Sequence, residues 1–164
     1  MQYYCEYYSP IGKIFLQSDG CCMTELKFEN QKYFVSPSDS AENCPDLPLF
    51  KSVCRWLDAY FNGENPEISF DVRVQGSEFC RRVWDELMNI PYGKTDTYAG
   101  VAARLEEKYG KNTSARAVGG AVGRNPVAII IPCHRVVGSD SSLTGYAAGT
   151  DKKRFLLSLE GVLI

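Results

Sequence analysis

The chain has 164 residues, of which 45% are hydrophobic and 23% charged, with a formal net charge of −2. These values are ordinary for a globular protein and exclude a disordered or fibrous chain. The sequence contains no apolar run of membrane-spanning length, and the first eight residues include an acid and several tyrosines, unlike a signal peptide. We therefore expect a cytoplasmic protein with no membrane partner.

Charge is unevenly distributed along the chain. Residues 1–91 carry 8 basic and 14 acidic side chains, residues 92–135 carry 7 and 3, and residues 136–164 carry 3 and 3. The negative total argues against a nucleic-acid partner, but the excess of basic residues in the middle stretch suits contact with phosphate groups.

The seven cysteines are an odd number, and Cys21 and Cys22 are adjacent, so a complete disulfide framework is not expected. There is no Cys-x-x-Cys pair, and the only histidine lies far along the sequence, so the usual zinc-site spacings are absent. We expect reduced thiols and no metal. A cysteine-only site through Cys5 with Cys21 or Cys22 stays open as an alternative.

The first half of the chain has the pattern of a small sheet with one helix. Strands are predicted near residues 3–8, 14–17 and 22–28, followed by a polar loop over 30–48. Apolar residues at helical spacing then run from Leu49 to a stop at Asn62-Gly63. A further short strand is expected at 68–74. A linker at Gln75-Gly76 would separate a domain of residues 1–75 from one of residues 76–164.

In the second half, Ser77, Thr97 and Ser114 are predicted to cap three helices. The last two helices are separated only by the turn at 110–113, and helix, short turn, helix is a recurring DNA-binding arrangement. Arg116, near the start of the last of them, is the residue best placed to reach bases or phosphates. For Gly119-Gly120, tight packing against the neighbouring helix is the alternative to contact with a ligand. The first of the three helices should bury Phe79, Val83, Trp84 and Leu87.

A cysteine follows next to the only histidine. The apolar run at 127–131 is typical of a buried strand, and Pro132 should end it and leave Cys133 at an exposed mouth beside His134. A cysteine or a histidine on its own is more often structural, and their adjacency favours a catalytic pair without proving it.

A last helix is predicted to begin at Thr150 or Asp151, bury Phe155, Leu156 and Leu159, and end at Gly161. Glu160 lies just before this stop. If Glu160 points inward, it completes a cysteine, histidine and carboxylate arrangement, in which the acid orients the imidazole and the imidazole deprotonates the thiol. The direction in which Glu160 points is left open by the sequence.

With these motifs, the chain resembles the methylated-DNA–protein-cysteine methyltransferases, also called O6-alkylguanine-DNA alkyltransferases. Residues 132–136 (Pro-Cys-His-Arg-Val) match the family's active-site motif, and residues 116–120 (Arg-Ala-Val-Gly-Gly) match its recognition helix. The similarity spans roughly residues 77–161, and further matches fall at Asn125-Pro126, Gly145-Tyr146, Leu156-Leu157 and Glu160. The resemblance implies an α/β (α+β) fold: a ribonuclease H-like sheet-plus-helix domain, then a winged-helix-like domain with a helix-turn-helix.

The resemblance also implies irreversible, single-turnover transfer of a methyl or larger alkyl group from O6-alkylguanine, flipped out of duplex DNA, to Cys133. O4-alkylthymine is an open second substrate, and no cofactor is implied. His134 would act as base through a water and Glu160 would orient it, while Asn125 would brace the site and Tyr98 would donate to N3 of the guanine. The other implied DNA or base contacts are Arg116 in the gap left by the base, Ala117, Gly119, Arg135, Val136, Tyr146 and Ala147.

Two departures from the family pattern stand out. Ala147 lies where many relatives have serine, and the first half contains no histidine, so the zinc site of some animal relatives is not expected. Three other functions remain as alternatives. An alkyltransferase-like protein would bind damaged DNA without transfer, but such proteins have another residue at the acceptor position. A cysteine hydrolase would turn over repeatedly, and a transcription factor would only bind DNA. We expect a monomer.

Overall fold

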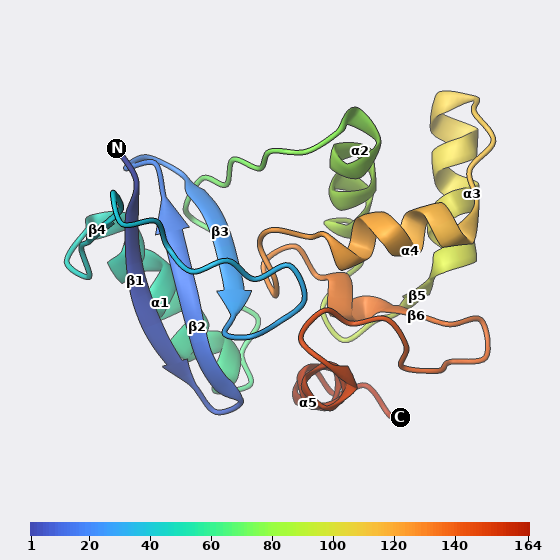
Figure 1. Cartoon of the computed structure of the whole chain (residues 1–164). Coiled ribbons are helices and arrows are strands. Elements are labelled where there is room, and N and C mark those ends of the chain that lie inside the picture. Colours follow the sequence, from blue (N-terminus) through green and yellow to red (C-terminus); the bar gives the residue numbers. More distant parts are fainter. The chain divides into compact units, whose positions relative to one another are not determined.

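The computed structural model describes all residues, 1–164, and the chain forms two compact units (Figure 1). The first unit comprises Met1–Gln75 with Pro126–Ile130, and the second comprises Gly76–Asn125 with Ile131–Ile164. None of the helices has the length and apolar character needed to cross a membrane. The fold is mixed α/β, as predicted.

A four-stranded sheet with the order β3-β2-β1-β4 forms most of the first unit. Strands β1 (Tyr3–Ser9), β2 (Gly12–Ser18) and β3 (Met23–Phe28) are antiparallel and confirm the three strands expected there. Gly12, with φ 123°, makes the tight turn between β1 and β2, a backbone conformation that favours glycine. Strand β4 (Glu42–Asn43), parallel to β1, lies within the segment expected to be loop.

Helix α1 (Pro48–Phe61) packs its apolar stripe on this sheet, as the helical spacing predicts. Tyr7 of β1 donates to Asp58 of α1 at 2.6 Å at the edge of that contact. Each large apolar side chain that becomes fully buried here contributes about 1.5–3 kcal/mol. The buried side chains of α1 are Phe50, Val53, Trp56, Leu57 and Tyr60.

Two segments expected to be strands are not strands. Val72 forms only an isolated bridge with Met23, and Val127 forms one with Leu26. After Val127 the chain turns, with Ile129 at φ 69°, and residues 127–131 are all nearly inaccessible to solvent. A continuous apolar run indicates that a segment is buried on every side, but it does not specify the backbone conformation. Here the buried segment is a turn and not an extended strand.

In the second unit, the three predicted helix caps are all confirmed. Ser77 accepts from Cys80 N at the start of α2 (Glu78–Leu87), Thr97 from Gly100 N at the start of α3 (Tyr98–Tyr109), and Ser114 from Ala117 N at the start of α4 (Ala115–Gly123). Such caps typically contribute about 1 kcal/mol each, because they satisfy backbone N–H groups that have no partner inside the helix.

Helices α2, α3 and α4 pack against one another around an apolar core. The indole N–H of Trp84 on α2 donates to the Ala121 carbonyl of α4 at 2.9 Å. Phe79, expected in this core, is only half-buried, because it lies at the start of α2 where the core ends.

The rest of the second unit holds the Cys-His motif. The 3₁₀ helix η1 (Cys133–Arg135) leads into β6 (Val136–Val137), which pairs in parallel with β5 (Asp96–Thr97). Helix α5 (Thr150–Leu159) follows. Its buried side chains are Lys153, Leu156 and Leu157, whereas Phe155 is exposed and Leu159 half-buried, so two of the three residues predicted to be buried are wrong. The inward face is rotated toward positions 153 and 160.

Candidate active site and DNA-binding surface

Cys133 opens η1 directly after Pro132, and it is 5% exposed. Burial raises the pKa of its thiol, because a thiolate is poorly solvated there, while the Asn125 amide, the Lys153 charge and the Tyr146 hydroxyl act in the opposite direction. The sequence predicts an exposed mouth at this position, and the structure has an almost closed one instead. The thiol is therefore protonated until a base removes its proton.

His134 and Glu160 form a buried pair. His134 Nε2 lies 2.6 Å from Glu160 Oε2, and neither side chain is exposed. Burial lowers the pKa of His134 despite the opposing carboxylate, so the imidazole is neutral near pH 7. With the Nε2 proton donated to the carboxylate, Nδ1 is the basic nitrogen of the ring. This is the tautomer that a proton acceptor for a neighbouring thiol requires.

Glu160, at the C-terminal end of α5, points inward, which was the question the sequence left open. Its Oε1 also accepts from Arg135 Nε at 2.8 Å and from the backbone N–H of Gly93 at 3.1 Å. Gly93 has φ 75°, and a Cβ there would lie 3.0 Å from the Glu160 carbonyl. The glycine therefore permits this close approach, a role that the sequence analysis missed although Gly93 lies in a Pro-Tyr-Gly turn signal.

Arg135, expected among the DNA contacts, has its guanidinium bound inside the unit. Besides its bonds to Glu160, its Nη1 donates to the Ile90 carbonyl at 2.7 Å. The Arg135 side chain thus balances the charge of Glu160 and ties η1 to the end of α2 and to α5.

Lys153 is a buried cation that the sequence analysis missed. It is 1% exposed, donates to the carbonyls of Val136 and Thr144, and lies 5.7 Å from the centroid of the Tyr98 ring. Burial lowers the pKa of Lys153 to about 8, and the neighbouring Cys133 sulfur acts against that shift. Lys153, Leu156, Leu157 and Glu160 follow i, i+3, i+4, i+7 spacing, a signal that places both charged residues on the apolar face.

Three further predicted residues lie around Cys133. The Asn125 side-chain amide donates to the Ile131 carbonyl at 2.8 Å, which braces the turn before Pro132. The Tyr146 hydroxyl is buried, and its pKa is raised by burial and by Cys133, so it stays a donor. Tyr98 donates to the Thr144 carbonyl at 3.0 Å, and burial raises its pKa as well. Ala147, next to Tyr146, is half-buried.

Helices α3 and α4 form the predicted helix-turn-helix, and Arg116 and Ala117 are exposed on the first turn of α4. A Cβ at Gly119 would meet only the Tyr98 ring, at an ordinary 3.8 Å, and one at Gly120 would meet nothing. Tight packing against a neighbouring helix therefore does not explain these glycines. The backbone of α4 is left accessible instead.

The basic character of residues 92–135 is partly neutralised by carboxylates outside that stretch. Glu86 of α2 is buried and binds both Arg104 and Lys108 of α3, and Glu160 binds Arg135. Lys111 and Arg116, on the turn and on α4, are exposed. The charge count therefore overestimates the charge available to phosphate. Of the exposed cations, Lys111 and Arg116 lie around the start of α4.

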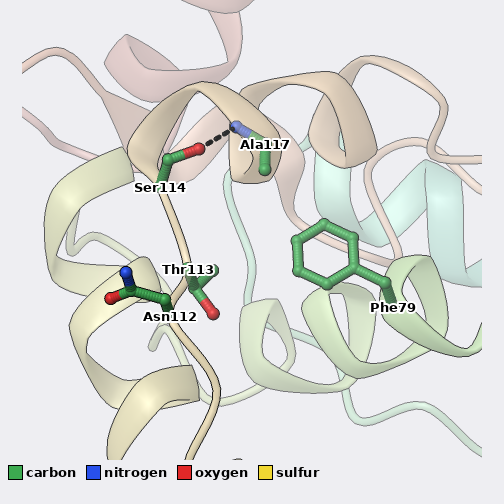
Figure 2. Close-up of a pocket in the computed structure, with 5 residues that line it drawn as sticks. All are labelled: Phe79, Asn112, Thr113, Ser114 and Ala117. Atoms are coloured by element: carbon green, nitrogen blue, oxygen red, sulfur yellow. Dashed lines mark hydrogen bonds between the residues drawn. The ribbon is translucent and has the colours of Figure 1, made fainter.

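A surface pocket of ≈ 480 Å³ lies beside this turn (Figure 2). The ring of Phe79 from α2 points toward the turn and the start of α4, where the Ser114 hydroxyl accepts from the Ala117 N–H (Figure 2). The residues that line the pocket lie outside the Cys133 site. The lining residues are Phe79, Asn112, Thr113, Ser114 and Ala117. No group of three or more His, Cys, Asp or Glu side chains has an arrangement that could hold a metal ion.

Both parts of the chain match sequence models of one family. Residues 2–74 match the 6-O-methylguanine DNA methyltransferase, ribonuclease-like domain, and residues 78–162 match the 6-O-methylguanine DNA methyltransferase, DNA binding domain. The methylated-DNA–protein-cysteine methyltransferase of Haemophilus influenzae is 40% identical over 98% of this chain and 87% of its own length. The protein of the same name from Methanosarcina acetivorans is 45% identical over 97% and 98%.

Solved structures agree with this assignment. Mycobacterium tuberculosis OGT in complex with DNA superimposes with a TM-score of 0.84 at 39% identity, covering 96% of this chain and 92% of that one. An O6-methylguanine DNA methyltransferase from Methanococcus jannaschii has a TM-score of 0.68 at 30% identity, covering 97% and 94%. Both the domain models and the relatives extend over nearly the whole sequence. The chain therefore belongs to the 6-O-methylguanine DNA methyltransferase family.

Proposed function

We propose that this protein repairs duplex DNA by transferring the alkyl group of O6-alkylguanine irreversibly to Sγ of Cys133. The observation that carries the proposal is the buried His134–Glu160 pair at 2.6 Å, directly next to Cys133 in η1. The family membership supports the same chemistry. No cofactor is needed, because the alkyl carbon passes directly from oxygen to sulfur.

Activation begins with proton removal from Cys133. Neutral His134 accepts the proton through a water, and Glu160 stabilises the imidazolium that results. Arg135 already balances the charge of Glu160. The charge of Lys153 then offsets the new thiolate, and the Asn125 amide and Tyr146 hydroxyl donate to it. These interactions partly offset the cost that burial imposes on ionising Cys133.

Transfer follows once the damaged base has left the stack. The Cys133 sulfur forms a bond to the alkyl carbon as the bond from that carbon to O6 breaks, and the guanine leaves with negative charge. Tyr98 donates to N3 of the leaving base and stabilises that charge. Its hydroxyl now donates to the Thr144 carbonyl, so base binding exchanges one acceptor for another. The thioether product has no carbonyl for water to attack, so each molecule reacts once.

The remaining contacts recognise the base and the duplex. The Val136 carbonyl accepts from Lys153, and its second lone pair can accept from the guanine amine, as can the Cys133 carbonyl. Tyr146 and the Ala147 N–H line the pocket near O6. On α4, Arg116 fills the gap left by the flipped base, while Ala117 and Gly119 let the DNA backbone approach closely. We assign Arg135 the role of positioning Glu160, and this role replaces the DNA contact expected from the sequence.

The proposed form is a monomer acting in the cytoplasm. A two-domain chain with one acceptor cysteine needs no second copy, and its seven free cysteines suit a reducing compartment. Activity on O4-alkylthymine belongs to the same chemistry, because its alkyl carbon is also attached to an exocyclic oxygen, which leaves with the negative charge of the base.

The test is to incubate the protein with a duplex that contains one O6-methylguanine and then to measure its mass. We expect one added methyl group per molecule, on the peptide that contains Cys133. Cys133→Ala should bind the same duplex without gaining mass, and Cys80→Ser should react like the unmodified protein. Methylation of another cysteine would refute the assignment. Binding without transfer would indicate an alkyltransferase-like protein, and repeated turnover would indicate a hydrolase.

A further inference from the structure

Three cysteines that play no part in the proposed transfer lie together in the first unit. Cys5 is on β1 and is 2% exposed, while Cys54 on α1 and Cys44 just after β4 are half-buried. The Cys44 N–H donates to the Tyr4 carbonyl at 2.9 Å, one step beyond the pairing of Tyr4 with Asn43. In parallel strands, paired residues point to the same side of the sheet, so Cys44 lies beside Cys5 on the side that α1 covers.

The contact between β1 and α1 brings Cys54 to the same place. Tyr7 donates to Asp58 at 2.6 Å, and these residues follow Cys5 by two and Cys54 by four positions. Two residues of a strand span about 6.6 Å, and four residues of a helix span about 6 Å. Cys5 and Cys54 therefore precede the Tyr7–Asp58 bond by nearly the same distance along β1 and α1, which places the two cysteines opposite each other. The two thiols lie near enough for each to shift the pKa of the other.

The two sulfurs differ in their electrostatic surroundings. The hydrogen bond with Cys54, together with burial, raises the pKa of Cys5, and the charges of Cys44 and Glu6 act in the same direction. The bond from Cys5 lowers the pKa of Cys54, although burial and the Asp58 carboxylate oppose this. The proton therefore stays on the more buried sulfur, and the thiolate forms on the more accessible one.

We propose that Cys54 and Cys5 form a peroxide-sensitive dithiol, in which Cys54 is the sulfur oxidised first and Cys5 forms a disulfide with it. The Cys54 thiolate attacks one oxygen of a hydroperoxide, the O–O bond breaks, and the departing oxygen takes a proton and leaves as water or an alcohol. Cys54 is then a sulfenic acid. The Cys5 sulfur attacks that sulfur, the S–O bond breaks, and water leaves with the Cys5 proton. Two thiols are oxidised and one peroxide is reduced.

The product joins β1 to α1 within the first unit, and a dithiol reductant reverses it by thiol–disulfide exchange. This chemistry is independent of alkyl transfer, since it involves neither Cys133 nor its neighbours. Disulfide formation can therefore be measured in the absence of DNA, and the result does not depend on the proposed repair activity.

The experiment treats the reduced full-length protein with hydrogen peroxide at neutral pH, blocks the remaining thiols with iodoacetamide and maps the peptides by mass spectrometry. We expect a peptide pair joined through Cys5 and Cys54, reversed by dithiothreitol. Cys5→Ser should instead leave a sulfenic acid on Cys54 that reacts with dimedone. Cys54→Ser should form no disulfide at Cys5.

Cys80→Ser is the matched control, because Cys80 is also a half-buried cysteine on a helix but lies in the other unit. It should form the Cys5–Cys54 disulfide as fast as the unmodified protein. Should Cys5→Ser fail to fold, the peptide map of the unmodified protein still decides. A disulfide between any other two cysteines, or dimedone labelling of Cys54 no faster than that of Cys80, would overturn the proposal.

Discussion

His134 Nε2 lies 2.6 Å from Glu160 Oε2 in a part of the protein that solvent does not reach. The pair joins η1 to the end of α5, across 26 residues of sequence. The orientation of the imidazole next to Cys133 therefore depends on the docking of α5. The same carboxylate also binds Arg135 and Gly93, so it organises three segments of the site.

Replacing Glu160 with glutamine tests this dependence. Glu160→Gln keeps the size of the side chain but removes the charge that stabilises protonated His134. We expect the rate constant of alkyl transfer to fall by about 10²-fold, in the range that general-base catalysis contributes. Single-turnover kinetics with methylated duplex measure it. Affinity for unmodified DNA should stay the same, and an unchanged transfer rate would remove Glu160 from catalysis.

Lys153→Met should shift the pH dependence of transfer. The Lys153 charge lowers the pKa of Cys133, so its removal raises that pKa, and the reaction should require a higher pH. Methionine preserves most of the buried aliphatic stem. The measurement is the transfer rate from pH 6 to pH 9, with Lys152→Met as the neighbouring control. A profile that keeps its midpoint while only the maximum falls would contradict an electrostatic role.

Arg116→Ala separates base extrusion from chemistry. If Arg116 fills the gap in the duplex, its loss should slow repair of duplex DNA by about 10-fold or more. The upper limit of this effect is set by the cost of unstacking the base, which is a few kcal/mol. Reaction with free O6-benzylguanine should change little, because that base needs no extrusion. Comparing the two rate constants gives the answer. Equal losses on both substrates would argue against the wedge role.

Glu86→Gln tests the buried ion pairs between α2 and α3. Glu86 binds Arg104 and Lys108, and the bonds to them lower its pKa against the effect of burial. We expect a loss of about 2 kcal/mol in the free energy of unfolding at pH 7. The loss is no larger because both cations are partly exposed, so solvent screens the ion pairs. The control is Glu107→Gln, at an exposed position of α3.

The pH dependence of that loss has a definite sign. A carboxylate whose pKa is lower in the folded state stabilises the protein above its unfolded pKa, 4.5, and loses the contribution as the pH falls through the folded value. The difference between Glu86→Gln and the unmodified protein should therefore shrink below pH 4.5. Urea denaturation at several pH values measures it, and a difference that grows with acid would contradict the ion-pair explanation.

Local structure could be predicted wherever it depends on near neighbours in sequence. Ser77, Thr97 and Ser114 cap helices because a short hydroxyl side chain reaches N–H groups only three residues away. The run at 127–131 was misassigned because burial by distant segments and extension along a strand produce the same apolar pattern. The buried face of α5 was misjudged for a related reason: Lys153 can cover apolar contacts with its stem and bind carbonyls with its ammonium group.

Sequence alone determined the adjacency of Cys133 and His134 and the helices that begin at capping residues, because covalent order and short-range hydrogen bonds suffice for those. Only the tertiary structure decided that Glu160 points inward, that Arg135 binds it, and that Lys153 lies near the acceptor sulfur. These contacts join residues that are distant in the chain. Their energies depend on which charges are excluded from water together, and that is a property of the packed fold.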